Sequence, residues 1–287
     1  MKAPPFAYAR AATTEEALDL LAESGDDAKV LAGGQSLLPL LAYRLIRPSH
    51  LVDICGVGRL STARPDEGEL VLDALVRHAQ VERMPLVGTH ALLGEAAAAI
   101  GHLPIRNRGT LGGSLAHADP AAELPLVAVA LDASVALRSV AGERRITAES
   151  FFHGPFATAL AADELLTALV VPPPLLDAGA AFAEFAVRAG DFALASAAVV
   201  LGHRDGHIHH VRIVLGGVDA MPLRARAAEA LLADQPPTME AIGAAAAAAA
   251  SECDPVTDQQ GSALFRRELV FTLVQQCLQR ALARDSL

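Results

Sequence analysis

Two short glycine segments of similar outline constrain the fold of this chain more than any other feature. They are residues 32–36, AGGQS, and residues 110–114, TLGGS. The first follows an apolar stretch typical of a strand, and both end in a serine suited to a helix start. Glycine lets a backbone approach a ligand closely, and free N–H groups at such a turn favour negative charge. Either segment alone is explained by a tight turn before a helix.

The two segments together favour a dinucleotide. A pyrophosphate carries adjacent anionic groups, which suit backbone donors arriving from more than one direction. Neither segment matches the patterns G-x-G-x-x-G or G-x-x-x-x-G-K-[ST], so the sequence indicates neither a Rossmann fold nor a P-loop. The ligand is therefore expected in a different kind of cradle.

Composition excludes several other functions. A formal charge of -10 argues against a nucleic-acid partner. Cys55, Cys253 and Cys277 form no C-x-x-C pair, so no zinc or iron–sulfur site is expected on this chain. No signal peptide or membrane span is indicated, and a cytoplasmic location is expected.

The first half of the chain predicts alternating strands and helices. A capping box at Thr13 begins a helix that Gly25 ends, and Ser36 is expected to cap an apolar helix that ends before Pro48. Further expected elements are strands at 29–32, 51–54, 70–76, 134–139 and 165–171 and a helix at 92–100. The aperiodic stretch 105–125 is expected to be a binding loop.

Three consecutive prolines at 172–174 predict a domain boundary. Beyond them, residues 180–188, 196–203 and 207–216 predict an antiparallel meander with a turn at 204–206, followed by helices near 224–232, 239–251 and 261–284. The expected division is a ligand-binding domain at 1–174, with subdomains of about 1–56 and 57–174, and a C-terminal α+β domain at 175–287.

The glycine pair also carries a resemblance to a known family. AGGQS together with RNRGTLGGSLAHADP at residues 106–120 resembles the FAD-binding medium subunit of the molybdenum hydroxylases, relatives of xanthine dehydrogenase and carbon monoxide dehydrogenase. The resemblance implies an α+β fold: a vanillyl-alcohol-oxidase (PCMH)-type FAD-binding domain of two α+β subdomains. A smaller C-terminal α+β domain with an antiparallel sheet and helices would follow.

The resemblance also implies which residues would bind FAD. Both glycine loops would act through backbone donors, with apolar residues near the flavin, a carboxylate that accepts from FAD hydroxyls, and a loop beside the isoalloxazine. These residues are Val30, Leu31, Ala32, Gly33, Gly34, Gln35, Ser36, Leu37, Ile100, Thr110, Leu111, Gly112, Gly113, Ser114, His117, Glu123, Leu166, Asp191 and Phe192.

The implied function is an electron relay without a catalytic acid or base on this chain. Electrons would pass from a 2Fe-2S small subunit through FAD to an external acceptor, while a large subunit with the molybdenum cofactor hydroxylates the substrate. A dimer of such heterotrimers is expected. Two alternatives stay open: a self-sufficient FAD-dependent oxidase or dehydrogenase, and a scaffold subunit that has lost FAD.

Three groups of polar residues allow simpler interpretations. His117 and Asp119 are expected to support the FAD site rather than catalyse. The histidines at 203, 207, 209 and 210 fit an exposed hairpin better than a metal site, and no metal ligand is expected. Arg106 and Arg108 suit either phosphates or surface ion pairs.

Overall fold

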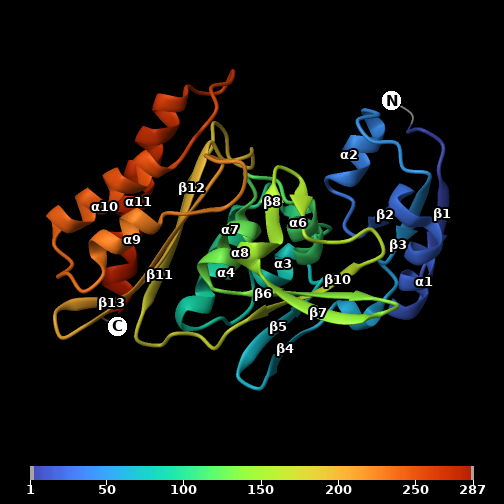
Figure 1. The fold of residues 1–287 in the computed structure, drawn as a ribbon, viewed down its shortest axis with the longest axis horizontal. Coiled ribbons are helices and arrows are strands. Elements are labelled where there is room, and N and C mark those ends of the chain that lie inside the picture. The colour runs from blue at the N-terminus through green and yellow to red at the C-terminus, as the bar shows by residue number, and fades with distance from the viewer. Residues whose placement is uncertain (1–2, 286–287) are drawn as a thin grey trace.

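The computed structural model describes residues 3–285 and has an α+β fold (Figure 1). Its N-terminal part is a parallel sheet in the strand order β1-β3-β2. Thr13 caps the first helix by accepting from the N–H of Glu16, and Gly25 ends that helix at φ 59°, so the predicted cap and stop are confirmed. The capping box is incomplete, because the Glu16 carboxylate accepts from the N–H of Ala12 at 2.7 Å and not from that of Thr13. The elements are β1 (Ala7–Arg10), α1 (Thr14–Ser24), η1 (Gly25–Asp27), β2 (Ala28–Leu31), α2 (Leu37–Ala42) and β3 (His50–Asp53).

Helix α2 is shorter than predicted. It ends at Ala42, where Arg44 adopts a left-handed backbone with φ 58°. The N–H of Leu45 then donates to the carbonyl of Leu40 at 2.9 Å, which is the Schellman way of closing a helix. Ser36 occupies the N-cap position of α2, as predicted, but its side chain makes no capping hydrogen bond.

The middle part is built on an antiparallel sheet in the order β4-β5-β10-β6-β7. The strands predicted at 134–139 and 165–171 are confirmed as β6 and β10. The elements are η2 (Gly58–Leu60), β4 (Ala63–Asp66), β5 (Glu69–Asp73), α3 (His78–Val81), η3 (Gly88–His90), α4 (Ala91–Ala99), α5 (Leu103–Arg106), α6 (Leu111–His117), α7 (Glu123–Ala130), β6 (Ser134–Ser139), β7 (Gly142–Thr147), α8 (Ala148–Phe151), β8 (Phe152–Gly154), β9 (Ala157–Thr158) and β10 (Leu165–Val171).

The predicted binding loop at 105–125 is largely helical, which corrects the sequence interpretation. Helices α5 and α6 are too short to show a clear period, and every residue of α7 is buried. A helix buried on all sides has no polar face and therefore no amphipathic pattern to detect.

The C-terminal part is an antiparallel sheet in the order β11-β12-β13-β14 with three helices. Asp205 and Gly206 have φ of 53° and 81°, as a type I′ hairpin requires, so the predicted meander and turn are confirmed. The elements are β11 (Gly179–Phe185), β12 (Ala195–Arg204), β13 (His207–Gly216), β14 (Leu223–Arg224), α9 (Arg226–Leu232), α10 (Met239–Glu252) and α11 (Ala263–Asp285).

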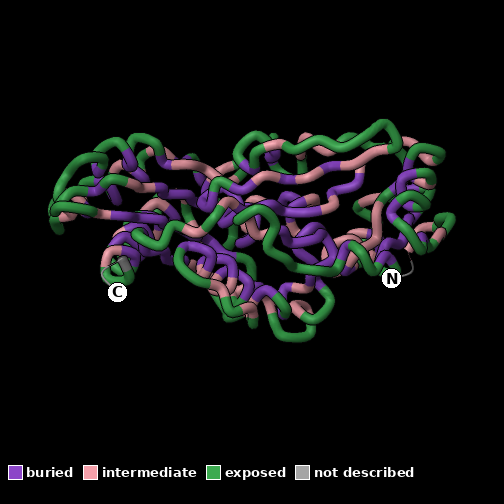
Figure 2. Tube along the Cα trace, turned by 90° about the horizontal axis from the view of Figure 1, so that it is seen from below, coloured by how far each residue is buried: buried purple, intermediate pink, exposed green. Residues whose placement is uncertain are grey.

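One hydrophobic core joins the middle and C-terminal parts. It combines Leu93 of α4 and Val127 of α7 with Phe182, Val200 and Val214 from the C-terminal sheet. The other face of that sheet packs on α9, α10 and α11 in a second core. Figure 2 shows the buried stretches running along the length of the molecule. Within residues 3–285, no helix is both long and apolar enough to cross a membrane.

Candidate cofactor-binding site

The fold brings the two glycine loops against each other. Gly33 packs so tightly on the carbonyl of Arg108 that a Cβ at this position would overlap it, and the same Cβ would lie 2.9 Å from the Cα of Gly109. Any side chain at residue 33 would push the loops apart. The N-terminal sheet and the helix after the second loop therefore meet at a contact that only glycine permits.

The first glycine loop, residues 32–36, offers free backbone donors. Gly34 is left-handed with φ 74°, and the carbonyl of Gly33 accepts from the side-chain amide of Gln35 at 3.1 Å. Within the described part of the chain, the N–H groups of residues 33–37 donate no hydrogen bond. Such a row of unused donors can bind an anionic or carbonyl-rich ligand.

In the second glycine loop, residues 110–114, the N–H groups of residues 111–114 donate hydrogen bonds within the protein. Its N–H groups hold the start of α6 to the segment after β5 and to the capping residue Thr110. The four bonds are Leu111 to Val76 O at 2.9 Å, Gly112 to Ala74 O at 2.8 Å, Gly113 to Thr110 Oγ1 at 3.1 Å and Ser114 to Thr110 O at 3.0 Å. The expectation that both loops bind through backbone donors therefore fits only the first loop.

The glycines of the second loop are needed for packing. A Cβ on Gly112 would lie 2.5 Å from the Cβ of Ala74, and one on Gly113 would lie 2.7 Å from Oγ1 of Thr110. Leu111 and Gly112 are buried, while Gly113 and Ser114 are partly open to solvent. The loop thus forms a rigid wall, with only its last residues exposed to a ligand.

A buried histidine that the sequence analysis missed supports this wall. Nε2 of His78 lies 2.9 Å from the carbonyl of Thr110, and its backbone N–H donates to the carbonyl of Gly109 at 3.2 Å. Burial lowers the pKa of His78 to about 4, so the ring is neutral at pH 7 and donates through Nε2. A histidine soon after a strand gives no signal of such a role in the sequence.

Two acidic side chains, Glu123 and Glu184, lie close enough to influence each other, and the Glu123 carboxyl accepts a hydrogen bond from its own backbone N–H. Glu123 is the first residue of α7 and is only 9% exposed. Burial, with smaller effects from the charges of Glu184 and Asp119, raises the pKa of Glu123 to about 8. Burial also raises the pKa of Glu184 to about 7, and one of its carboxyl oxygens is buried without a hydrogen bond in the described structure. A hydroxyl group of a ligand would supply the missing hydrogen bond to Glu184.

The remaining predicted site residues divide into core and rim. Ile100 and Leu166 are 8% and 4% exposed and belong to the middle core. The ring of His117 lies 5.0 Å from the ring of Phe156, and burial lowers the pKa of His117. Phe192 is 65% exposed.

The loop that carries Asp191 and Phe192 reaches the middle part of the molecule. Gly190 is left-handed with φ 84°, and a Cβ there would lie 2.5 Å from Cε1 of His102, just before α5. This contact places the exposed loop beside the segment that leads into the second glycine loop. The structure therefore joins residues from all three parts of the chain around one region.

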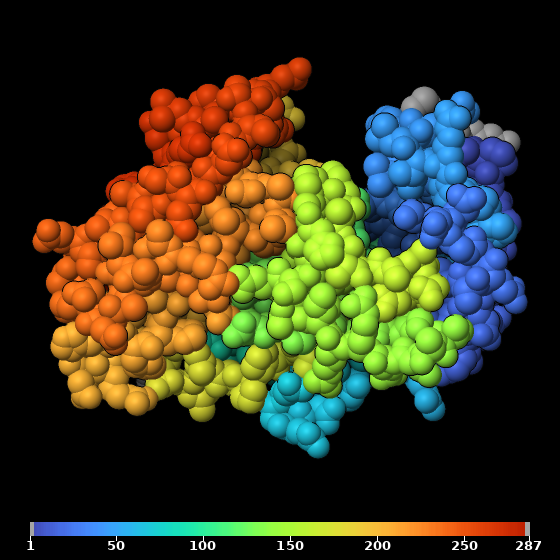
Figure 3. Space-filling view, viewed as in Figure 1, coloured from blue at the N-terminus to red at the C-terminus, as the bar shows by residue number. Residues whose placement is uncertain are grey.

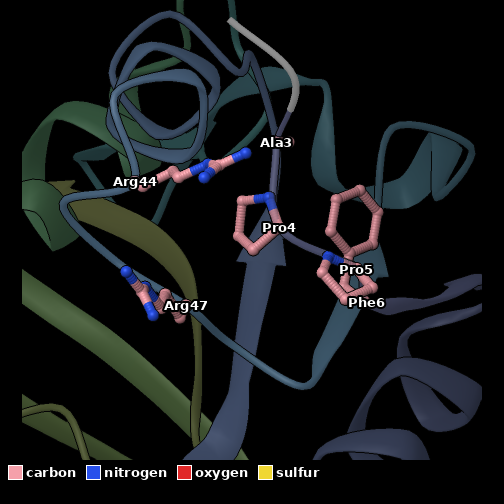
Figure 4. Close-up of a pocket in the computed structure, with 6 residues that line it drawn as sticks. All are labelled: Ala3, Pro4, Pro5, Phe6, Arg44 and Arg47. Carbon is pink, nitrogen blue, oxygen red and sulfur yellow. The ribbon is translucent and has the colours of Figure 1, made fainter.

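One face of the molecule is hollowed (Figure 3). In Figure 3 a recess separates the blue N-terminal lobe from the yellow-green part of the chain in the centre. A different cavity of about 670 Å³ lies where the N-terminal segment meets the loop after α2, and it is lined by Ala3, Pro4, Pro5, Phe6, Arg44 and Arg47 (Figure 4). Neither glycine loop lines that cavity, so its size does not make it the cofactor site.

Comparison with known proteins decides the family. Residues 4–174 match the model of the FAD-binding domain in molybdopterin dehydrogenase, and residues 180–281 match the model of the C-terminal domain of the carbon monoxide dehydrogenase flavoprotein. The chain belongs to this FAD-binding family. The predicted resemblance is confirmed, and with it the PCMH-type α+β fold class and FAD as cofactor.

Relatives of this FAD-binding family match the chain over nearly its full length. The alpha subunit of the 6-hydroxypseudooxynicotine dehydrogenase complex of Paenarthrobacter nicotinovorans is 44% identical over 99% of this chain and 97% of its own. The medium subunit of nicotine 6-hydroxylase from the same organism is 42% identical over 99% of this chain and 100% of its own. Both relatives are subunits of oxidoreductases.

Solved structures in the family share the whole fold. Carbon monoxide dehydrogenase from Hydrogenophaga pseudoflava superposes with a TM-score of 0.96 at 37% identity, covering 99% of each chain. Quinoline 2-oxidoreductase from Pseudomonas putida 86 superposes with a TM-score of 0.92 at 37% identity, covering 98% of each chain. At such identity the likeness extends beyond topology to a shared family.

The residues around the two glycine loops fit FAD. Within residues 3–285 the N–H groups of the first glycine loop are free for a pyrophosphate, and one carboxyl oxygen of Glu184 is buried without a partner, which a sugar or ribityl hydroxyl would supply. Within the described residues, no group of three or more His, Cys, Asp or Glu side chains is placed to hold a metal ion. Arg106 makes an ion pair with Glu82 at 2.9 Å, which decides its role in favour of pairing.

Proposed function

We propose that this chain is the FAD-binding electron-transfer subunit of a heteromeric molybdenum-containing hydroxylase or dehydrogenase. The observation that carries the proposal is the row of unused N–H donors at residues 33–37, in a chain that matches medium subunits over nearly its whole length. Bound FAD would supply the ability to accept and release electrons singly or in pairs. The chain's own residues bind and orient it.

We assign each predicted site residue a role in FAD binding from its position in the structure. The first glycine loop would hold the pyrophosphate through its backbone, and Glu123 would accept from FAD hydroxyls. Ile100 and Leu166 would supply apolar surface, and Ser114, His117, Asp191 and Phe192 would line the rim. The proposed domains are 1–174 and 175–287, with subdomains of about 1–56 and 57–174.

The proposed partners are a large subunit with the molybdenum cofactor and a small 2Fe-2S subunit, assembled as a dimer of heterotrimers in the cytoplasm. Relatives of this chain are named for nicotine, 6-hydroxypseudooxynicotine and caffeine. We therefore propose an N-heterocyclic substrate, bound on the large subunit. On this chain no acid or base would act on that substrate.

A second function has one observation in its favour. Glu123 and Glu184 have raised pKa values of about 8 and 7, and perturbed acids in a recess are frequent in active sites. They would be the candidate acids of a self-sufficient flavin enzyme. Burial alone accounts for both raised pKa values, and the unfilled hydrogen bond of Glu184 is explained equally by a cofactor hydroxyl, which is why the electron-relay function is preferred.

Anaerobic flavin reduction tests the proposal. The purified full chain with FAD should show a flavin spectrum that dithionite bleaches, while nicotine added alone at millimolar concentration leaves it unchanged. Bleaching by nicotine in the absence of partner subunits would favour the self-sufficient enzyme. A colourless preparation that takes up no added FAD would favour the scaffold without cofactor.

A further inference from the structure

Arg77 occupies a fixed position between the two glycine loops. Its backbone pairs with Thr110 in an isolated antiparallel bridge, and its N–H donates to Oε1 of Gln80 at 2.8 Å. The next residue, His78, bonds to Gly109 and Thr110. The Arg77 backbone is therefore attached to the wall that the second loop forms.

The Arg77 side chain reaches the contact between the loops. Its guanidinium donates to the carbonyl of Arg108, the same carbonyl on which Gly33 packs. Cys55 lies at the first glycine loop, where its thiol donates to the carbonyl of Ala32 at 2.9 Å. Burial and the neighbouring carboxylate of Asp53 raise the pKa of the Cys55 thiol, and the Arg77 charge opposes that rise.

The charge of Arg77 is not neutralised by the protein. Among the described residues no carboxylate lies within ion-pair distance of its guanidinium, whereas nearby Arg106 is paired with Glu82 at 2.9 Å. A guanidinium has five N–H donors, and the bond to Arg108 uses only part of them. An unpaired arginine beside a row of free backbone donors suits a phosphate group.

We propose that Arg77 is a side-chain component of the FAD cradle, which binds the pyrophosphate and holds the two glycine loops together through the carbonyl of Arg108. The N–H groups of residues 111–114 in the second loop are used within the protein, and Arg77 supplies a positive charge on that side. This inference rests on FAD binding by the chain but not on the electron-relay function.

Equilibrium binding of FAD to the apoprotein of the full chain tests the role of Arg77. The variants are Arg77→Gln, Arg77→Lys and, as the matched control, Arg83→Gln, which removes an exposed arginine just after α3. We expect Arg77→Gln to raise the Kd for FAD about 10- to 100-fold relative to the control, as loss of a charge-assisted hydrogen bond predicts. Arg77→Lys, which keeps the charge, should recover much of that loss.

The salt dependence of FAD binding distinguishes an electrostatic contribution of Arg77 from a purely structural one. The Kd of the control should rise with ionic strength more steeply than the Kd of Arg77→Gln, because the variant has lost a cation at the anion. Arg77→Gln with the Kd and salt dependence of the control would overturn the inference. Equal losses in Arg77→Gln and Arg77→Lys, matched by equal falls in apoprotein melting temperature, would also overturn it. If the wild-type chain binds no FAD, the proposed function fails as well.

Discussion

The two glycine loops look alike in sequence and do different work in the structure. The first loop keeps the N–H groups of residues 33–37 free of bonds within the described chain, while the second loop commits the N–H groups of residues 111–114 to the segment after β5 and to Thr110. One loop is a donor surface and the other is a structural wall. A glycine pair before a serine therefore indicates a close approach of backbone, and the neighbours decide whether the partner is a ligand or the protein itself.

The largest effect that separates the loops should follow from Gly112→Ala. The new Cβ would lie 2.5 Å from the Cβ of Ala74, which is buried and cannot move away. Overpacking of this kind should lower the free energy of unfolding of the apoprotein by about 3 kcal/mol. Urea denaturation measures it.

Gly243→Ala is the control for Gly112→Ala, because its Cβ would meet nothing within 4 Å and it lies inside helix α10. That variant should be stabilised by about 1 kcal/mol. If Gly112→Ala unfolds at the urea concentration of the wild type, the second loop is not the wall described above.

Glu123→Gln should alter how stability depends on pH. The pKa of Glu123 is about 8 in the folded chain and 4.5 as a free group, so the folded state holds this proton more tightly. The resulting stability is fully present below pH 4.5 and is lost as the pH rises through 8. At about 1.4 kcal/mol per unit, the loss between pH 6 and 8 is about 2 kcal/mol.

Melting of the apoprotein at pH 6 and 8 measures this dependence. The wild type should lose stability over that interval, and Glu123→Gln should lose less, because its amide stays neutral while Glu184 titrates in both proteins. Identical losses would show that Glu123 ionises normally. Bound FAD should reduce the loss in the wild type, since hydroxyl donors favour the carboxylate.

A smaller effect should distinguish the hydroxyl residues of the two loops. Thr110 caps α6 by accepting from the N–H of Gly113, so Thr110→Ala should cost about 1 kcal/mol of apoprotein stability. Ser36 makes no capping bond to α2, and Ser36→Ala should leave apoprotein stability unchanged. Denaturation midpoints of the two variants, measured side by side, check the contrast, and equal costs would contradict it.

The smallest expected effect concerns the rate of a chemical modification. Cys55 is exposed and bonded to Ala32 of the first loop, whereas Cys253 and Cys277 are buried. FAD should slow alkylation of Cys55 by iodoacetamide several-fold without altering the two buried cysteines, as followed by mass spectrometry. Unchanged labelling of Cys55 would mean that the cofactor does not cover the first loop.

Local patterns allowed much of the fold to be predicted from the sequence. Neighbouring residues account for the helix cap at Thr13, the apolar strands β6 and β10, the turn at Asp205 and Gly206, and the alanine-rich helix α10. Helix α7 was missed because it is buried on every side, and α2 was predicted too long because a left-handed Arg44 has no sequence signal.

The sequence by itself determined the family and the positions of both glycine loops, because the close approach of backbone at Gly33 and Gly112 admits no side chain. Only the tertiary structure decided what each loop does. A sequence does not show which N–H groups are bonded, because the acceptors come from distant parts of the chain. The second loop donates to Val76 and Ala74, whereas within residues 3–285 no acceptor meets the N–H groups of residues 33–37. The role of Arg77 could not be predicted for the same reason. Only the tertiary structure shows that its guanidinium bonds to the carbonyl of Arg108 and that no carboxylate among the described residues pairs with it.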